Sequence, residues 1–483
     1  MTDTDSLNIK NNLRPARWRL RPNERRVLLV FGDFAVAVLA LAIALIVWAQ
    51  DPKEWLNFSY IFLRERPPFW FYLLPFGWVI LMIQLYDVRR AARRQETVVG
   101  VFFAAAISLV VYVLVFFFLS APDLPLPRRG VAVFIGVTAL LTILWRLLYI
   151  RIFTAPQFMR RVLIVGAGRA GSTLVRVTRA LWPLPFFLVG FIDDDPEKIG
   201  TEIEGVKVLG GGDRLLEILQ REMVTDLIFA ITGDMQTQTF QSILTAGERG
   251  VDVTTMPIVY EELLGRVPIF LLHSDWILRS FVDQVHAGGL YAMSKRLLDL
   301  VGGLVGMLML ALVFPFIALS IIIDDGFPIF YRQIRLGKNG QPYNIVKFRT
   351  MRRDAEKDGK ARMATENDDR ATRVGRFLRK SHLDELPQFV SVVIGDMSLV
   401  GPRAERPELV DHLQKKVPFY RARLFVKPGL TGWAQVNFGY ASTVEDTAVK
   451  LEYDLYYIKH RNLALDLTTL VRTIGTVVGL RGQ

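Results

Sequence analysis

Four long apolar segments in the first third of the chain constrain its fold most strongly. They lie near residues 27–50, 69–86, 98–120 and 131–153. Each is close to the ~20 residues that a helix needs to cross the hydrocarbon core of a bilayer. We therefore expect residues 27–155 to form an N-terminal four-helix transmembrane bundle, preceded by a basic cytoplasmic segment at residues 1–26.

The distribution of Lys and Arg predicts the orientation of these helices. Eleven cations stand before the first apolar segment or between the second and third, against five in the other two loops. Loops on the cytoplasmic side carry the excess of these residues. The N-terminus should therefore be cytoplasmic, and four crossings would return the chain to the cytoplasm at Arg160 and Arg161.

The composition fits a protein that is part membrane and part globular, and it excludes several kinds of site. Hydrophobic residues make up 51% and charged residues 22% of the 483 residues, and cysteine does not occur. Disulfides, thiolate nucleophiles and iron-sulfur clusters are therefore excluded. The five histidines are not paired at metal-ligand spacing, so we expect no catalytic zinc. The net charge of +12 favours phosphate-bearing partners or an anionic membrane face, and we expect no nucleic-acid partner.

A glycine-rich motif begins a second domain. The sequence RRVLIVGAGRAG predicts a strand, a tight turn at Gly166, Gly168 and Gly171, and a helix. Such a turn lets the backbone approach a pyrophosphate at the helix N-terminus, and Asp193 stands where a ribose-binding acid would follow. Alternating strand and helix patterns predict a Rossmann-like α/β domain of the nucleotide-binding type at residues 160–258. A fold that keeps the glycine turn for packing alone fits the motif equally well.

After a connector at residues 259–289, the chain returns to the membrane. The helix expected at residues 294–323 is apolar apart from Asp299 and contains Pro315, which should kink it. Basic residues flank both of its ends, so neither end is suited to the outer side. The helix could cross the bilayer, or it could be re-entrant and return to the same face. We expect Asp299 to hold it by pairing with an Arg.

Several long motifs then follow in order. They are DDGFPIFYRQIRLGKNGQPYNIVKFRTM, RFLRKSHLDELPQFVSVVIGDMSLVGPR and KPGLTGWAQVN. With their flanks they resemble the bacterial sugar transferase family, the monotopic polyprenyl-phosphate phosphoglycosyl transferases. The resemblance implies a mainly α catalytic domain at residues 290–483 and a re-entrant helix at residues 294–323 held by Lys295, Arg296, Asp299 and Pro315.

The resemblance also implies a reaction and its location. A sugar-1-phosphate would pass from a nucleoside diphosphate sugar, a UDP-hexose, to undecaprenyl phosphate with release of UMP. The reaction would take place on the cytoplasmic face of a bacterial inner membrane, as the first membrane step of exopolysaccharide, capsule or O-antigen synthesis. Nothing in the sequence identifies the sugar. A homodimer through the middle domain is compatible with it.

Asp384 and Glu385 form the candidate catalytic pair. Two acids at a helix start are also ordinary capping residues, with Asp384 as N-cap and Pro387 in the first turn. The resemblance implies that Asp384 attacks the β-phosphate and that the lipid phosphate then displaces the carboxylate. It further implies that Mg2+ bridges phosphate oxygens near both acids, with Glu385 as metal partner or proton handler.

Fixed cations should complete a clamp on the transferred phosphate, although each could instead be a solvated surface charge. The candidates are Lys347, Arg349, Arg376, Arg403 and Arg332. The stretches GPR and KPGLTGW read as loops that rim the site. The family's usual Ser-Pro at the helix break is Phe314-Pro315 here, which warns against transferring sugar specificity from any relative.

Two other classes of function stay open. The pattern Tyr291-x-x-x-Lys295 resembles the Tyr/Lys pair of nucleotide-sugar dehydratases, so a membrane nucleotide-sugar 4,6-dehydratase is one alternative. The other is a non-enzymatic scaffold on which the membrane helices organise polysaccharide assembly. Consumption of a UDP-sugar only when lipid phosphate is added would separate the transferase from both.

Overall fold

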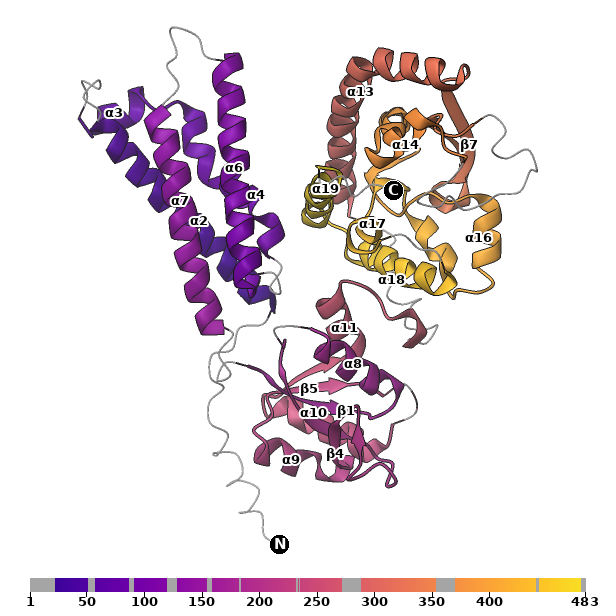
Figure 1. Cartoon of the computed structure of the whole chain (residues 1–483). Helices are drawn as coiled ribbons and strands as arrows, with labels where there is room; N and C mark the ends of the chain where they lie inside the picture. Colours follow the sequence, from indigo (N-terminus) through magenta and orange to yellow (C-terminus); the bar gives the residue numbers. More distant parts are fainter. Residues whose placement is uncertain are drawn as a thin grey trace. The chain divides into compact units, whose positions relative to one another are not determined.

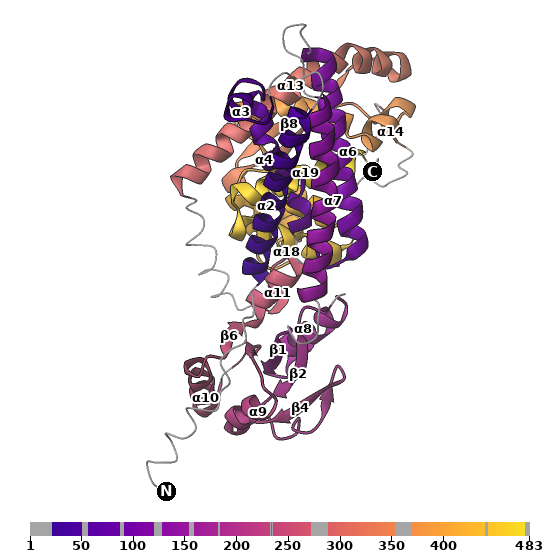
Figure 2. The ribbon, with the colours of Figure 1, turned by 90° about the vertical axis from the view of Figure 1, so that its left-hand side faces the viewer.

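The computed structural model describes most of the chain in three parts (Figures 1 and 2). The described residues are 22–50, 57–86, 91–119, 128–153, 159–181, 184–231, 233, 235–271, 288–352, 370–439 and 443–478. Most of the basic segment at residues 1–26 and part of the connector lie outside these ranges. The chain divides into two compact units, residues 1–256 and 257–483.

Three of the four predicted N-terminal membrane segments are long apolar helices. They are α2 (Pro22–Ala49), α6 (Arg94–Leu119) and α7 (Arg128–Phe153). The second segment differs, because it consists of the short helices η2 (Phe69–Leu73), α4 (Leu74–Leu81) and η3 (Ile83–Tyr86), after α3 (Tyr60–Glu65). Pro75 lies in the first turn of α4, where a proline is tolerated but begins a new helix rather than extending the previous one.

A buried ion pair joins the helices of the bundle. Arg146 of α7 donates from Nη2 to Asp33 Oδ2 of α2 at 2.6 Å, and both side chains are fully buried. Arg146 Nη1 also donates to the carbonyl oxygen of Leu85 at 2.7 Å. Charges within a membrane are expensive unless they are paired in this way, so the pair fixes how α2, α7 and η3 pack.

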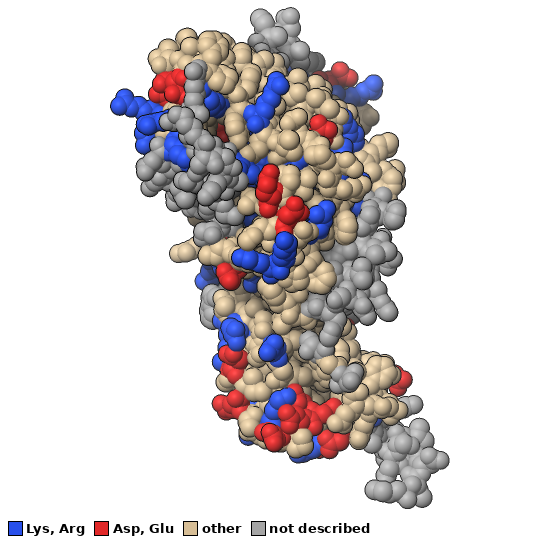
Figure 3. Space-filling model, turned by 90° about the vertical axis from the view of Figure 1, so that its right-hand side faces the viewer, with Lys and Arg blue, Asp and Glu red and all other residues tan. Residues whose placement is uncertain are grey.

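The middle domain is a doubly wound α/β fold, as predicted. Its sheet has the order β3-β4-β2-β1-β5-β6 and is parallel except for the edge strand β3. The strands are β1 (Arg161–Val165), β2 (Phe187–Ile192), β3 (Glu202–Ile203), β4 (Val206–Gly210), β5 (Asp226–Phe229) and β6 (Asp252–Thr255). The helices are α8 (Arg169–Arg179), η5 (Gly212–Arg214), α9 (Leu215–Arg221) and α10 (Thr237–Glu248). Figure 3 shows acidic and basic side chains side by side on this domain, as expected for a surface that faces water.

The described part of the predicted connector belongs to the core of the second unit. Helix α11 (Met256–Leu264) is followed by η6 (Ile269–Leu271). Val267 donates its backbone N–H to the carbonyl oxygen of Glu452 at 3.0 Å, and Trp433 Nε1 donates to that of Gly265 at 2.8 Å. The compact second unit therefore includes α11 and η6 together with the region after residue 290, whereas residues 272–287 lie outside the described residues.

The long apolar helix α13 (Gly289–Asp325) has 37 residues and contains Pro315. Figure 1 shows that it changes direction sharply within its length, as a proline kink would produce. A Cβ on Gly302, Gly303 or Gly306 would lie 2.3 to 2.7 Å from the side chain of Leu399, Val393 or Phe389, so these glycines permit close packing. Beyond the bend, Ile317 and Ile321 are buried in a cluster with Phe348, Leu378 and Leu386.

The rest of the catalytic unit is mainly helical. Its elements are β7 (Phe330–Leu336), η7 (Lys338–Gly340), β8 (Pro342–Phe348), α14 (Arg373–Lys380), η8 (Leu383–Gln388), α15 (Phe389–Ile394), β9 (Ser398–Val400), α16 (Pro407–Leu413), η9 (Tyr420–Phe425), β10 (Gly429–Thr431), α17 (Trp433–Asn437), α18 (Val444–His460) and α19 (Leu463–Val478). Strands β7 and β8 form an antiparallel hairpin. The GPR and KPGLTGW stretches, which the sequence predicts to be loops, lie next to each other. Strand β9 directly precedes GPR, strand β10 lies within KPGLTGW, and the two strands pair in parallel.

Candidate active site

Asp384 and Glu385 lie in the first turn of the short 3-10 helix η8. The N-cap is His382, in the left-handed conformation with a φ of 56°, so the predicted N-cap position of Asp384 is wrong by two residues. The chain turns at His382 between α14 and η8, which moves the helix start ahead of both acids. Pro387 consequently lies inside the helix, where its missing N–H matters little because a 3-10 helix of six residues has few internal hydrogen bonds.

Glu385 holds two of the predicted phosphate-binding cations. Its Oε1 accepts from Lys347 Nζ at 2.6 Å and from Arg403 Nη2 at 2.7 Å. Burial alone would raise the pKa of Glu385, but the charges of Arg403 and Lys347 outweigh it and hold the pKa well below its ordinary value. Glu385 is therefore ionised at neutral pH and is unsuited to carry a proton there.

The pKa of Asp384 is shifted in the opposite direction from that of Glu385. Its side chain is buried, yet among the described residues no hydrogen bond or ion pair reaches its carboxylate. Burial, followed by repulsion from Glu385, raises the pKa of Asp384 to about 6, against the opposing pull of Lys347, Arg403 and Arg379. An unpaired carboxylate beside a cation cluster has the character of a nucleophile or a phosphate-site ligand.

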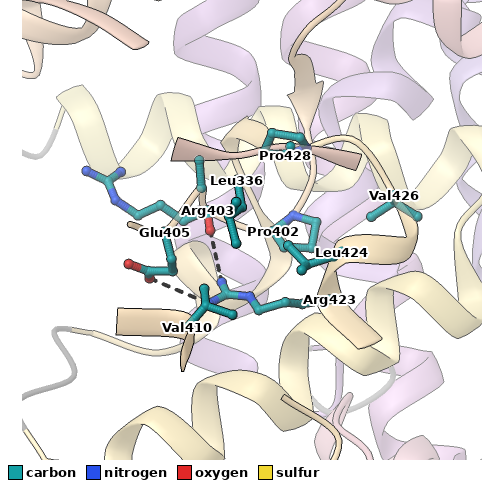
Figure 4. Close-up of a pocket in the computed structure, with 11 residues that line it drawn as sticks. Leu336, Pro402, Arg403, Glu405, Val410, Arg423, Leu424, Val426 and Pro428 are labelled. Carbon is teal, nitrogen blue, oxygen red and sulfur yellow. Dashed lines mark hydrogen bonds and ion pairs between the residues drawn. The ribbon is translucent and has the colours of Figure 1, made fainter. Parts of the chain in front are cut away.

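Buried contacts fix the two cations in place. Lys347 lies on β8, opposite Tyr331 of β7. Arg403 follows β9, and behind it Arg423 Nη2 donates to the Arg403 carbonyl oxygen at 3.0 Å and pairs with Glu405, as Figure 4 shows. The Arg403 guanidinium extends away from Arg423 in the same view. Its Nη2 donates to Glu385. The Arg423–Glu405 support was not singled out from the sequence.

The other predicted phosphate ligands lie elsewhere. Arg349 is buried and donates to the carbonyl oxygens of Asp325, Gly326 and Phe327, so it caps the end of α13. Arg332 pairs with Val346 in the hairpin, one position away from the Tyr331–Lys347 pair, so its side chain points to the opposite face.

Helix α14 carries both Arg376, a predicted phosphate ligand, and Arg379. Arg376 is exposed on α14, whereas Arg379, one turn later, lowers the pKa of Asp384. Sequence spacing could not distinguish the two, because residues three apart lie on one helix face. Arg379 is therefore a further α14 cation near the candidate nucleophile, and phosphate binding by Arg376 stays a prediction.

The residues expected to hold the membrane helix do so, although with different partners. Arg296 donates to the carbonyl oxygens of Val392 and Val393 at 3.0 and 2.7 Å, at the end of α15. Asp299 does not pair with an arginine as predicted. Its Oδ1 accepts instead from Ser398 Oγ and the Leu399 N–H, both at 2.9 Å, because the tight packing at Gly302 and Gly303 brings β9 to this point.

The Tyr291–Lys295 pattern is part of the same anchoring. Tyr291 Oη, Lys295 Nζ and Tyr457 Oη all donate to the fully buried carboxylate of Asp466 in α19, at 3.0, 3.2 and 2.7 Å. Both polar groups of the pattern are thus engaged in joining α13 to α18 and α19. This arrangement favours a structural role over the dehydratase alternative.

The glycine turn of the middle domain is shaped chiefly by packing. Gly166 has a φ of +107°, and a Cβ on Gly171 would lie 2.1 Å from the Gly166 carbonyl oxygen, whereas one on Gly168 would meet open space. The carboxylate of Asp193 accepts from the Ala167 N–H at 2.8 Å and pairs with Lys198 at 3.2 Å. Asp193 thus contacts the turn itself, and nucleotide binding by this domain stays a prediction.

The carboxylate oxygens at the candidate site suit Mg2+ that is also bound by substrate phosphates, rather than a metal ion that the protein alone coordinates. Within the described ranges, no group of three or more His, Asp or Glu side chains could hold a metal ion. Mg2+ is commonly bound by one or two carboxylates together with substrate phosphates. Asp384 and the Oε2 atom of Glu385, to which no described residue donates, fit that pattern.

Comparison with known proteins assigns both globular parts. Residues 290–479 match the family model for bacterial sugar transferases, and residues 82–257 match that for a CoA-binding domain. A UDP-N-acetylgalactosamine-undecaprenyl-phosphate N-acetylgalactosaminephosphotransferase of Aeromonas hydrophila is 39% identical over 220 residues, which cover 46% of this chain and 51% of the relative. A UDP-glucose:undecaprenyl-phosphate glucose-1-phosphate transferase of Caulobacter vibrioides is 39% identical over 189 residues, covering 38% of this chain and 70% of the relative.

A shorter relative is matched over most of its length. An uncharacterised sugar transferase of Bacillus subtilis is 37% identical over 188 residues, which cover 39% of this chain and 89% of the relative. The site and the apolar helix beside it define a membrane-associated transferase-type domain. The chain belongs to the bacterial sugar transferase family. It spans about half the length of several curated relatives that it matches.

Proposed function

We propose that this protein transfers a sugar-1-phosphate from a UDP-sugar to undecaprenyl phosphate and releases UMP, as the first membrane step of exopolysaccharide, capsule or O-antigen synthesis. The observation that carries the proposal is the buried carboxylate of Asp384, which has no partner in the described part of the chain, beside a carboxylate that holds Lys347 and Arg403. Relatives named for this reaction with UDP-glucose and UDP-N-acetylgalactosamine support it. The sugar that this chain transfers is left open.

The reaction balances as two displacements at one phosphorus. An Asp384 oxygen attacks the β-phosphorus of the UDP-sugar, the bond from that phosphorus to the bridging oxygen breaks, and UMP leaves with that oxygen. A phosphate oxygen of the lipid then attacks the same phosphorus, and the Asp384 carboxylate leaves unchanged. Each step therefore brings an anionic nucleophile to an anionic phosphate, and nearby positive charge is needed in both.

The surrounding charges favour both displacements. Lys347 and Arg403 are already oriented by Glu385, so they can stabilise the negative charge on the transferred phosphate without reorganisation. We assign Glu385 the positioning of these cations rather than proton transfer. Mg2+ would be held by Glu385, Asp384 and substrate phosphate oxygens, and when bound it would neutralise part of the phosphate charge.

The same proposal includes a re-entrant α13 and a catalytic unit on the cytoplasmic face of the inner membrane. Both ends of α13 contact the catalytic unit, since Arg296 and Asp299 bind α15 and β9, and Arg349 caps the C-terminal end. A helix of 37 residues that crossed straight through a bilayer would extend about 55 Å and separate these ends. The loop charges support the cytoplasmic side. The homodimer stays a prediction.

The decisive experiment screens UDP-sugars with undecaprenyl phosphate and Mg2+ and measures UMP release from the full chain in membranes. We expect UMP release to need both a suitable UDP-sugar and the lipid for repeated turnover. Asp384→Asn should abolish transfer, whereas Asp411→Asn, at an exposed acid of α16, should leave it unchanged. Substantial turnover by Asp384→Asn would refute the nucleophile.

Two other results would support the alternatives. NAD-dependent conversion of the sugar without lipid would indicate the dehydratase. Failure to consume any nucleotide sugar would favour the scaffold.

A further inference from the structure

A second cationic pocket lies at the start of α13, apart from the Asp384 site. It has a volume of about 320 Å³ and is bounded by the first turns of α13, by β9 and by the segment before β10. Five cationic side chains line it, namely Lys295, Arg296, Lys338, Lys427 and Arg461. The lining includes none of Asp384, Glu385, Lys347 and Arg403, so we treat it as a separate site, the "α13 pocket".

Acidic groups balance only part of this charge. Asp299 is the one acid among the residues that line the pocket, and its Oδ1 already accepts two hydrogen bonds. Asp466 lies behind the wall and pairs with Lys295. Asp396 acts on Lys427 from a distance, yet burial and the charges of Arg296 and Lys338 leave the pKa of Lys427 below its ordinary value. The pocket therefore retains an excess of positive charge.

Two of the lysines are available to a ligand. Within the ranges that the structure describes, neither the Lys338 nor the Lys427 side chain makes a hydrogen bond or ion pair. Lys338 is exposed on η7 and Lys427 is partly buried, so the two side chains approach the pocket from different segments. Two ammonium groups with no protein acceptor favour an anion with several oxygens, such as a phosphate.

The surface beside the pocket is apolar. Leu290, Met293 and Leu297 project from the same turns of α13 and are 79%, 67% and 63% exposed. They continue into the segment of α13 that is long and apolar enough to enter a membrane. The pocket thus lies beside the start of the helix that is apolar and long enough to enter a membrane.

We propose that the α13 pocket binds the phosphate headgroup of an anionic membrane glycerophospholipid, with Lys338 and Lys427 as its main ligands. Basic pockets beside membrane helices recognise such headgroups, and each lysine near the surface contributes about 1 kcal/mol. The volume is at the lower end of the range for small-ligand sites and suffices for a glycerophosphate group. Binding would fix the depth and tilt of α13, independently of the transfer reaction.

The test compares lipid retention by the full chain in native mass spectrometry after exchange between phosphatidylglycerol and phosphatidylcholine. The probe variant is Lys338→Gln with Lys427→Gln, and the matched control is Lys415→Gln with Lys416→Gln, at two exposed lysines of the same unit. We expect wild type and control to retain phosphatidylglycerol preferentially. The probe variant should retain it roughly 10- to 30-fold more weakly while keeping its thermal midpoint.

Three results would overturn the proposal. The first is equal retention by probe and control variants. The second is displacement of phosphatidylglycerol by inorganic phosphate at equal concentration, which would indicate a site for free phosphate. The third is preferential displacement by undecaprenyl phosphate, which would indicate a site for the acceptor lipid.

Discussion

The two neighbouring acids of η8 differ because only one of them has counter-charges in contact. Glu385 is paired with Lys347 and Arg403, while Asp384 is buried without a partner among the described residues. The pKa of Glu385 is lowered and that of Asp384 is raised, to about 6. Such a separation assigns different roles to a pair of carboxyl groups.

The raised pKa of Asp384 predicts the pH dependence of the first displacement. Only the ionised carboxylate can attack phosphorus, so the rate of UMP release without lipid should rise with pH and level off above a midpoint near 6. A rapid-quench measurement of the stoichiometric UMP burst tests this, because omitting the lipid removes its titrating phosphate. A burst independent of pH between 5 and 8 would contradict the assignment.

The same shift predicts an effect on stability. Because the folded-state pKa of Asp384 lies above the ordinary value of 3.8, folding favours the protonated form, and this contribution is lost as pH rises through about 6. Asp384→Asn cannot ionise, so it should raise the thermal midpoint at pH 8, by about 2–4 °C per kcal/mol regained. The difference from wild type should vanish below pH 4. A lower midpoint of the variant at pH 8 would contradict this.

At the scale of residues, sequence motifs suggest which kinds of side chain belong to the site, but they do not predict where each side chain lies. Lys347 and Arg349 are two residues apart, and the period of a strand would place both at the site. Strand β8 ends at Phe348, however, so Arg349 leaves the pleat and caps α13 instead. The roles that the motif resemblance gives to Asp384 and Arg403 stay predictions, and the resemblance could not show that the left-handed His382 begins the helix.

At the scale of elements, the bundle depends on one ion pair that sequence patterns do not reveal. Asp33 and Arg146 are separated by 113 residues and lie in apolar segments whose periodicity says nothing about pairing. The close packing at Gly302, Gly303 and Gly306 is a shorter-range effect, because small residues in membrane helices allow neighbouring side chains to approach. Residues far apart in the sequence, such as Asp33 and Arg146, are seen to pair only in the folded structure.

We predict that replacing one residue of the Asp33–Arg146 pair lowers the stability of the protein more than replacing both. Asp33→Asn leaves the Arg146 charge buried and should cost about 3–5 kcal/mol of stability, whereas Asp33→Leu with Arg146→Met should recover most of that loss. Thermal midpoints in detergent measure this, with Glu65→Gln at an exposed acid as control. If the double variant were as unstable as the single one, the pair would have a role beyond charge compensation.

At the scale of the whole molecule, the predicted membrane topology depends on the loop charges and on the bend of α13, which Figure 1 shows. The absence of cysteine makes labelling decisive, since each introduced cysteine is the only one.

We expect Gly288→Cys and Gln341→Cys, before and after α13, to react with an impermeant maleimide only after the cells are permeabilised. Phe58→Cys, in the predicted outer loop, should react in intact cells and serves as the positive control. The cysteine-free parent gives the background. Labelling of positions 288 and 341 from opposite sides would show that α13 crosses.

The buried ion pair of the bundle also has a consequence for biosynthesis. The ribosome completes α2 long before α7, so for 113 residues of elongation the acid at position 33 enters the bilayer without its counter-charge. During that interval the charge of Asp33 opposes the insertion of α2, because Arg146 has not yet been synthesised. The ion pair between α2 and α7 can form only after Arg146 has been synthesised and inserted, so the order of synthesis determines when the position of α2 in the bilayer becomes fixed.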